Sequence, residues 1–74
     1  MIFEIWDTES GNRLAEYRSE IDAIAFVKTV IDAYGDEAVG QWELFELLDD
    51  ESPRSVAFGE QLVELTHGLS STPA

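Results

Sequence analysis

The side chains best suited to bind a hard cation near the N-terminus are Asp7, Glu9 and Asn12, which flank Gly11 in the sequence. A calcium loop of the EF-hand type requires a glycine at its sixth position and a bidentate glutamate at its twelfth. Counted from Asp7, those positions hold Asn12 and Arg18. Serine, glycine and asparagine are common turn residues, so the stretch predicts a tight turn between two strands rather than a calcium site.

No other group of side chains has the composition of a catalytic or metal centre. His67 is the single histidine and cysteine is absent, which excludes a disulfide, a thiolate zinc site and a cysteine nucleophile. Asp49, Asp50 and Glu51 are consecutive, and such side chains on a turn point apart instead of converging on one ion. Glycine-rich phosphate loops and common hydrolase motifs are missing. The sequence therefore predicts a non-catalytic protein with no metal ion and no cofactor.

Acidic residues dominate the charge: 16 Asp and Glu stand against 4 Lys and Arg, which gives a net charge of −12. Nucleic acids and anionic membranes bind through Lys and Arg, so neither is an expected direct partner. A basic protein partner is compatible with this charge, and so is an acidic surface that only keeps the protein soluble. No apolar run approaches the length of a membrane span, and the N-terminal residues lack the basic start of a signal peptide, so we expect a cytoplasmic protein.

The turn around Gly11 joins two predicted strands, residues 2–7 and 13–18, in a hairpin. A three-residue loop, 9–11, gives one apolar face to the hairpin and places Gly11 where a left-handed residue is needed. A four-residue loop would set Phe3 opposite Glu16 and mix polar with apolar side chains on both faces. The preferred register pairs Asp7 with Arg13, Ile5 with Ala15 and Phe3 with Tyr17.

Residues 19–35 predict a long helix that covers one face of the sheet. Ser19 is a good N-cap, and Gly35 is a natural residue to follow the last turn. The apolar side chains recur at helical spacing along one broad arc. That arc contains Ala23, Ile24, Phe26, Val27, Val30, Ile31 and Tyr34.

The second half of the chain repeats strand, turn, strand and helix. Residues 41–49 have apolar side chains at both strand parities and also fit a helix, and we interpret them as a strand because turn-rich segments bracket them. Residues 55–59 predict a fourth strand, and residues 60–67 predict a short helix. The expected fold is α+β: a four-stranded antiparallel sheet in ββαββ(α) order with one long helix on one face. We expect one domain over residues 1–68 and a flexible tail over 69–74.

The face of the sheet opposite the long helix is the predicted interface. Trp6 and Leu14 pair on that face beside Ile2, and either the C-terminal segment folds back over them or another chain does. Trp42 and Leu44 belong to the strand that is apolar at both parities, which indicates contact on two sides. We therefore expect a homodimer with an interface that contains Ile2, Trp6, Leu14, Trp42 and Leu44.

The opening hairpin and helix, with R-S-E-I-D-A-I-A at the helix start, resemble the HicB-type antitoxins over residues 1–35. That family has a third strand before its helix, whereas this chain passes directly from Arg18 to Ser19, so the resemblance carries over no functional residue. The W-D-x-x-S-G-N hairpin also resembles that of small bacterial ββαββ proteins with no assigned activity. The resemblance implies an antitoxin-like binder of a basic protein.

Two classes of function remain open from the sequence. The first is a non-catalytic protein-interaction or regulatory module that associates with itself. The second is an acidic inhibitor that mimics nucleic acid, which requires carboxylates at regular, phosphate-like spacing, or an antitoxin-like binder of a basic protein.

Overall fold

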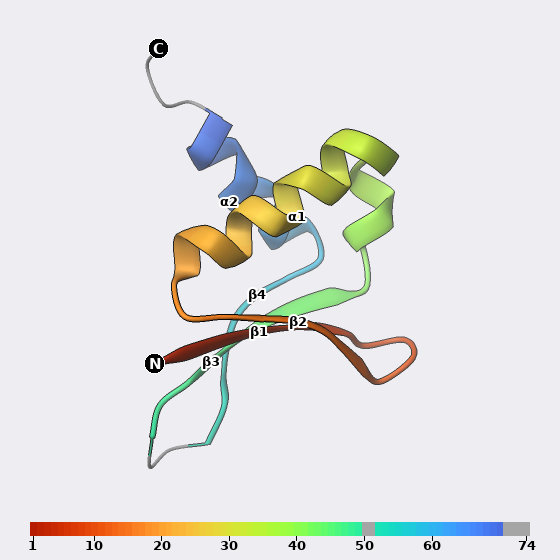
Figure 1. Ribbon diagram of the computed structural model, residues 1–74. Coiled ribbons are helices and arrows are strands. Elements are labelled where there is room, and N and C mark those ends of the chain that lie inside the picture. Colours follow the sequence, from red (N-terminus) through yellow and green to blue (C-terminus); the bar gives the residue numbers. More distant parts are fainter. Residues whose placement is uncertain (50–51, 71–74) are drawn as a thin grey trace.

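The computed structural model describes residues 1–49 and 52–70 and shows two layers, a sheet and a pair of helices (Figure 1). Asp50, Glu51 and residues 71–74 lie outside the described residues, and so does most of the acidic turn at 49–51. The elements in chain order are β1 (Ile2–Asp7), β2 (Asn12–Tyr17), α1 (Glu20–Tyr34), η1 (Asp36–Val39), β3 (Trp42–Leu47), β4 (Arg54–Phe58) and α2 (Glu60–Ser70).

The four strands form one antiparallel sheet in the order β2-β1-β3-β4. The hairpins β1–β2 and β3–β4 meet along β1 and β3, which places the N-terminal strand at the centre of the sheet. Ile5 lies opposite Leu44 at this junction. The α+β class and the four-stranded antiparallel sheet predicted from the sequence are therefore confirmed.

Both helices lie on one side of the sheet (Figure 1). α1 packs over β1 and β2, α2 packs over β3 and β4, and the two helices contact each other. The prediction of a single long helix as the main cover was therefore incomplete, because α2 has 11 residues against 15 in α1. α2 continues to Ser70, two residues past the predicted domain limit at 68.

The hydrophobic core fills the space between the helices and the sheet. Ile5, Val27 and Leu44 are completely buried at its centre. Burial of such side chains is the main stabilising term, about 1.5–3 kcal/mol for each. Among the residues whose burial the structure describes, the buried apolar ones are Phe3, Ile5, Ala23, Ile24, Val27, Val39, Leu44, Ala57, Leu62 and Val63.

The ends of α1 form as the sequence predicts. The Ser19 hydroxyl accepts a hydrogen bond from the Asp22 backbone N–H at 3.1 Å, and the Gly35 N–H donates to the Ile31 carbonyl at 2.7 Å. Tyr34 was expected on the buried arc, but its exposed fraction is 79%. The helix ends at this residue and the chain turns into η1, so Val39 fills the core in this region instead.

The register of the first hairpin differs from the predicted one near the turn. The expected pairs far from the turn are present, but Leu14 is an extra residue in β2 that forms a bulge and shifts the register by one. The loop is therefore one residue longer than predicted. Gly11 has the expected positive φ of 74° and donates its N–H to the Asp7 carbonyl at 2.8 Å. The observed pairs are Phe3–Tyr17, Glu4–Glu16, Ile5–Ala15, Trp6–Arg13 and Asp7–Asn12.

A second bulge lies in β4, where Val56 is the extra residue between the partners of Leu44 and Phe45. The chain then turns sharply at Gly59, whose φ is +57° and whose N–H donates to the Trp42 carbonyl at 2.9 Å. A Cβ atom at Gly59 would lie 2.8 Å from the Gly40 carbonyl oxygen. The path from β4 into α2 therefore requires glycine at this position.

Candidate functional site

One face of the sheet carries none of the described helices, and we call the side chains that project from it the helix-free face. Phe3, Ile5 and Leu44 point into the core, so their neighbours in the strands project to the other side. Phe58, with an exposed fraction of 41%, lies toward the β4 edge of this face. The side chains that strand pairing places on the helix-free face are Ile2, Glu4, Trp6, Arg13, Glu16, Glu43, Phe45, Leu47, Ser55 and Phe58.

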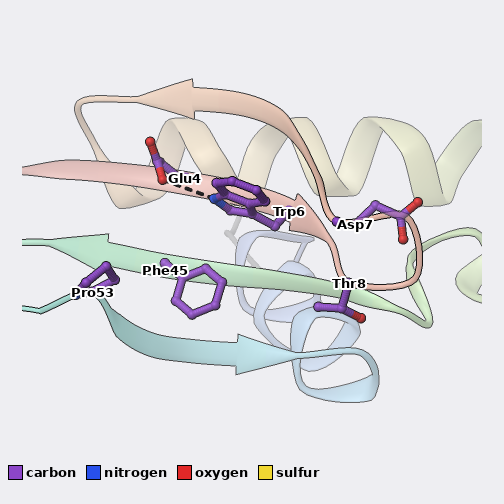
Figure 2. Close-up of a pocket in the computed structure, with 7 residues that line it drawn as sticks. Glu4, Trp6, Asp7, Thr8, Phe45 and Pro53 are labelled. Carbon is purple, nitrogen blue, oxygen red and sulfur yellow. Dashed lines mark hydrogen bonds between the residues drawn. The ribbon is translucent and has the colours of Figure 1, made fainter.

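The centre of the helix-free face contains a shallow hollow of about 350 Å³. Figure 2 shows Trp6 and Phe45 on neighbouring strands, with the helices behind the sheet. Pro53 limits the hollow near the start of β4, and Thr8 and Gly11 limit it at the β1–β2 turn. The hollow therefore has mainly apolar walls and opens to solvent.

A short chain of polar contacts fixes the Trp6 indole. Its Nε1 donates to Glu4 Oε1 at 3.0 Å (Figure 2). Arg13 Nη1 donates to Glu4 Oε2 at 2.9 Å. Arg13 also lies 4.0 Å from Glu16. The hydrogen bond to Glu4, and then the negative charges of Glu4 and Glu16, raise the pKa of the Arg13 guanidinium above its usual value. Both oxygens of Glu4 are engaged, and Arg13 balances its charge.

The carboxylate of Asp7 stabilises the β1–β2 turn. Its Oδ1 accepts from the Glu9 backbone N–H at 3.0 Å, and its Oδ2 accepts from the Ser10 hydroxyl at 3.0 Å. The Thr8 hydroxyl donates to the Gln41 carbonyl at 2.6 Å and ties the turn to the start of β3. The oxygen atoms of Asp7 and Thr8 therefore stabilise a turn. Within residues 1–49 and 52–70, no group of three or more acidic, histidine or cysteine side chains could hold a metal ion.

The predicted interface residues divide between the two faces of the sheet. Side-chain alternation along β1 places Ile2 and Trp6 on the helix-free face. The expected pair of Trp6 with Leu14 is wrong, because Trp6 lies opposite Arg13 and Leu14 is the unpaired residue of the β2 bulge. Leu44 is completely buried in the core, and it cannot take part in a surface contact. Trp42 stacks on Phe26 of α1, with ring centroids 6.0 Å apart and ring planes 7° from parallel. Both therefore face the helices, and the expectation of an interface role for them does not fit the fold.

Three apolar residues of the helix-free face were missing from the predicted interface: Phe45, Leu47 and Phe58. The sequence does contain a signal for two of them, because Phe45 and Leu47 share one strand parity and Trp42 and Leu44 share the other. Strand β3 is apolar at both parities, so its own pattern does not tell which set faces the core. Pairing with β1 determines which set faces the core, because the buried Ile5 lies opposite Leu44.

A second hollow, of about 470 Å³, lies between η1 and α2. Its walls are strongly acidic, with Val63 and Gly40 as the only lining residues that are neither acidic nor histidine. His67 lies in the last part of α2, where a cation is favoured at the negative end of the helix. The acidic lining residues are Asp36, Glu37, Glu60 and Glu64.

Comparison with known proteins finds no match: no family model fits the chain, and no curated protein or solved structure shows significant similarity to it. Among the described residues, no helix has the length and apolar character needed to cross a membrane.

Proposed function

We propose that this chain is a small cytoplasmic, non-catalytic protein-interaction module that binds its partner with the helix-free face of its sheet. The observation that carries the proposal is the aromatic hollow of Trp6 and Phe45 on a face that no described helix covers. A sheet of this kind buries one face against its helices and leaves the other for solvent or for another protein. Contiguous apolar side chains on such a face are typical of an interaction site.

The composition of the helix-free face supports a protein partner. Aromatic residues and arginine are enriched in the centres of protein interfaces, where tryptophan often contributes most of the binding energy. Here the Trp6 ring is held by Glu4 before any partner arrives. A side chain that is already ordered loses less conformational entropy on binding, so the face is prepared for association.

The carboxylates beside the hollow support a non-catalytic role. An acid or base catalyst must present an oxygen atom to its substrate. The oxygens of Glu4 are engaged with Trp6 and Arg13, and those of Asp7 are engaged within the turn. The groups nearest the hollow thus serve to position other parts of the fold.

Site-specific photocrosslinking tests the proposal. A photoreactive phenylalanine analogue replaces Phe45 in the helix-free face or, as a matched control, Tyr34, which is highly exposed at the end of α1. We expect a protein adduct from position 45 after irradiation of intact cells and little or none from position 34. No adduct from position 45, or equal adducts from both positions, would contradict the proposal.

A second candidate function uses the acidic hollow between η1 and α2, whose four carboxylates favour a basic protein partner. The nucleic-acid mimic and the antitoxin-like binder considered from the sequence would both use this surface. A partner of this type should be released by salt, because screening weakens attraction between exposed charges. It should also bind less well to the double variant Glu60→Gln/Glu64→Gln, whereas a partner of the helix-free face should not.

A further inference from the structure

We propose that the partner of the helix-free face is a second copy of the same chain, packed sheet against sheet around a twofold axis. This inference rests on the proposed function and names its partner. A twofold axis brings the same patch of both copies together, so a patch with an apolar centre is its own complement.

The distribution of charge supports a second copy. Repulsion between two chains of net charge −12 opposes association unless the acids lie away from the contact. Among the described residues, most exposed acids lie in the helical layer, on the side away from the sheet face. These are Glu20, Asp22, Asp32, Asp36, Glu37, Glu60 and Glu64.

The acids on the helix-free face itself are tied to neighbours within the chain. Glu4 is paired with Arg13, which also lies near Glu16, and Glu43 accepts a hydrogen bond from the Ser55 hydroxyl at 2.5 Å. A second copy would therefore meet Glu4 and Glu43 carboxylates that already accept hydrogen bonds, whereas Glu16 lies on the outer strand β2, near Arg13. These hydrogen bonds lower the cost of removing Glu4 and Glu43 from water, which is highest for an unpaired charge.

The size of the molecule also fits this partner. The Cα atoms span 38 × 29 × 16 Å, so the broad sides of the two-layer molecule are much larger than its edges. A stable interface of standard size buries about 800 Å² on each partner. One broad side is large enough for such a contact only if most of the sheet face takes part. The Trp6 and Phe45 hollows of both copies would then lie at the centre of the contact.

Sedimentation velocity of the purified full chain tests the inference, with protein from low to high micromolar concentration in moderate and high NaCl. We expect a dimer whose dissociation constant falls as salt rises, because salt screens the remaining repulsion. Trp6→Glu places a charge in the apolar centre and should raise the dissociation constant at least about tenfold. Tyr34→Glu adds the same charge at an exposed site on α1 and should leave it unchanged.

Circular dichroism shows whether each variant is folded. If Trp6→Glu does not fold, Phe58→Glu is the variant to test, because Phe58 is already partly exposed at the edge of the face. A wild-type chain that stays monomeric at high micromolar concentration in both salts overturns the inference. So does a dimer that the folded variants leave intact. A monomer that still gives a photoadduct with another protein from position 45 rejects the second copy and keeps the proposed function, whereas a monomer without an adduct rejects both.

Discussion

The carboxylate of Glu4 holds the two neighbours that shape the helix-free face, because one oxygen accepts from the Trp6 indole and the other from Arg13. Loss of a hydrogen bond of this kind costs about 1 kcal/mol. We expect Glu4→Ala to lower the free energy of unfolding by about that amount and to loosen the indole. Urea unfolding measures the first effect and NMR relaxation of the indole N–H the second. Glu9→Ala, at an exposed position in the turn, is the control and should change neither.

Gly11 is the residue on which the first turn depends, because its φ of 74° lies in the left-handed region. A β-branched side chain resists this conformation, so Gly11→Val should reduce the free energy of unfolding by about 1 kcal/mol or more. Gly11→Asn should cost less, since asparagine tolerates left-handed backbone. The urea midpoints of the two variants provide the measurement. An unchanged midpoint for the valine variant would mean that the turn adapts to the substitution.

The loop from Asp7 to Asn12 should not bind calcium specifically. Both Asp7 oxygens already accept hydrogen bonds within the turn, and the spacing of the other oxygen atoms does not match a calcium loop. Titration calorimetry with calcium chloride should therefore show no saturable heat at micromolar concentrations. A stoichiometric site in that range would show that the turn rearranges around the ion.

The role of a single residue could be predicted from the sequence where it depends on the local backbone conformation. The turn at Gly11, the cap at Ser19 and the end of α1 at Gly35 follow from the conformational preferences of those residue types. The side of the sheet on which Trp42 lies depends instead on pairing with β1, a strand far away in the sequence. No local pattern carries that information, and Trp42 was therefore expected at an interface although it stacks on Phe26.

At the scale of elements, the connection between β4 and α2 depends on a close backbone contact between Gly59 and Gly40. Gly59→Ala would place a Cβ atom 2.8 Å from the Gly40 carbonyl oxygen and strain a backbone with a φ of +57°. We expect a loss of about 1–3 kcal/mol in the free energy of unfolding. Thermal and urea unfolding both measure it.

Gly68→Ala is the matched control for this substitution. A Cβ atom at Gly68 would meet nothing within 4 Å, and the residue lies inside α2. Alanine is favoured over glycine within a helix by about 0.5–1 kcal/mol, so this variant should be at least as stable as the wild type. Equal losses in both variants would show that the contact between Gly59 and Gly40 is not the cause.

The order and type of the main elements were predictable because hydrophobic periodicity and turn residues are local signals. The register of the first hairpin is not determined by such local signals. The one apolar face of the hairpin required a three-residue loop in a regular ladder, yet the chain combines a longer loop with the bulge at Leu14. A bulge restores the alternation of side chains further along the strand, so the two solutions have the same apolar pattern and cannot be separated by it.

For the whole molecule, the net charge of −12 predicts how stability responds to salt. With four times as many acids as bases, repulsion outweighs the ion pairs, and screening should stabilise the folded chain. We expect the urea midpoint of a dilute, monomeric sample to rise between low and moderate NaCl. The rise should be smaller in Glu60→Gln/Glu64→Gln, which carries two fewer charges. A midpoint that falls with salt would mean that the ion pairs dominate.

The two bulges bear on whether the protein can polymerise. β2 and β4 are the outermost strands, and each contains an extra residue, Leu14 in one and Val56 in the other. An outer strand with a regular row of free N–H and C=O groups can template the addition of further chains, as in fibrils, whereas a bulge twists that row out of line. Growth by strand addition is thus hindered at both ends of the sheet. We therefore expect this chain, despite its open apolar face, to resist fibre growth by strand addition.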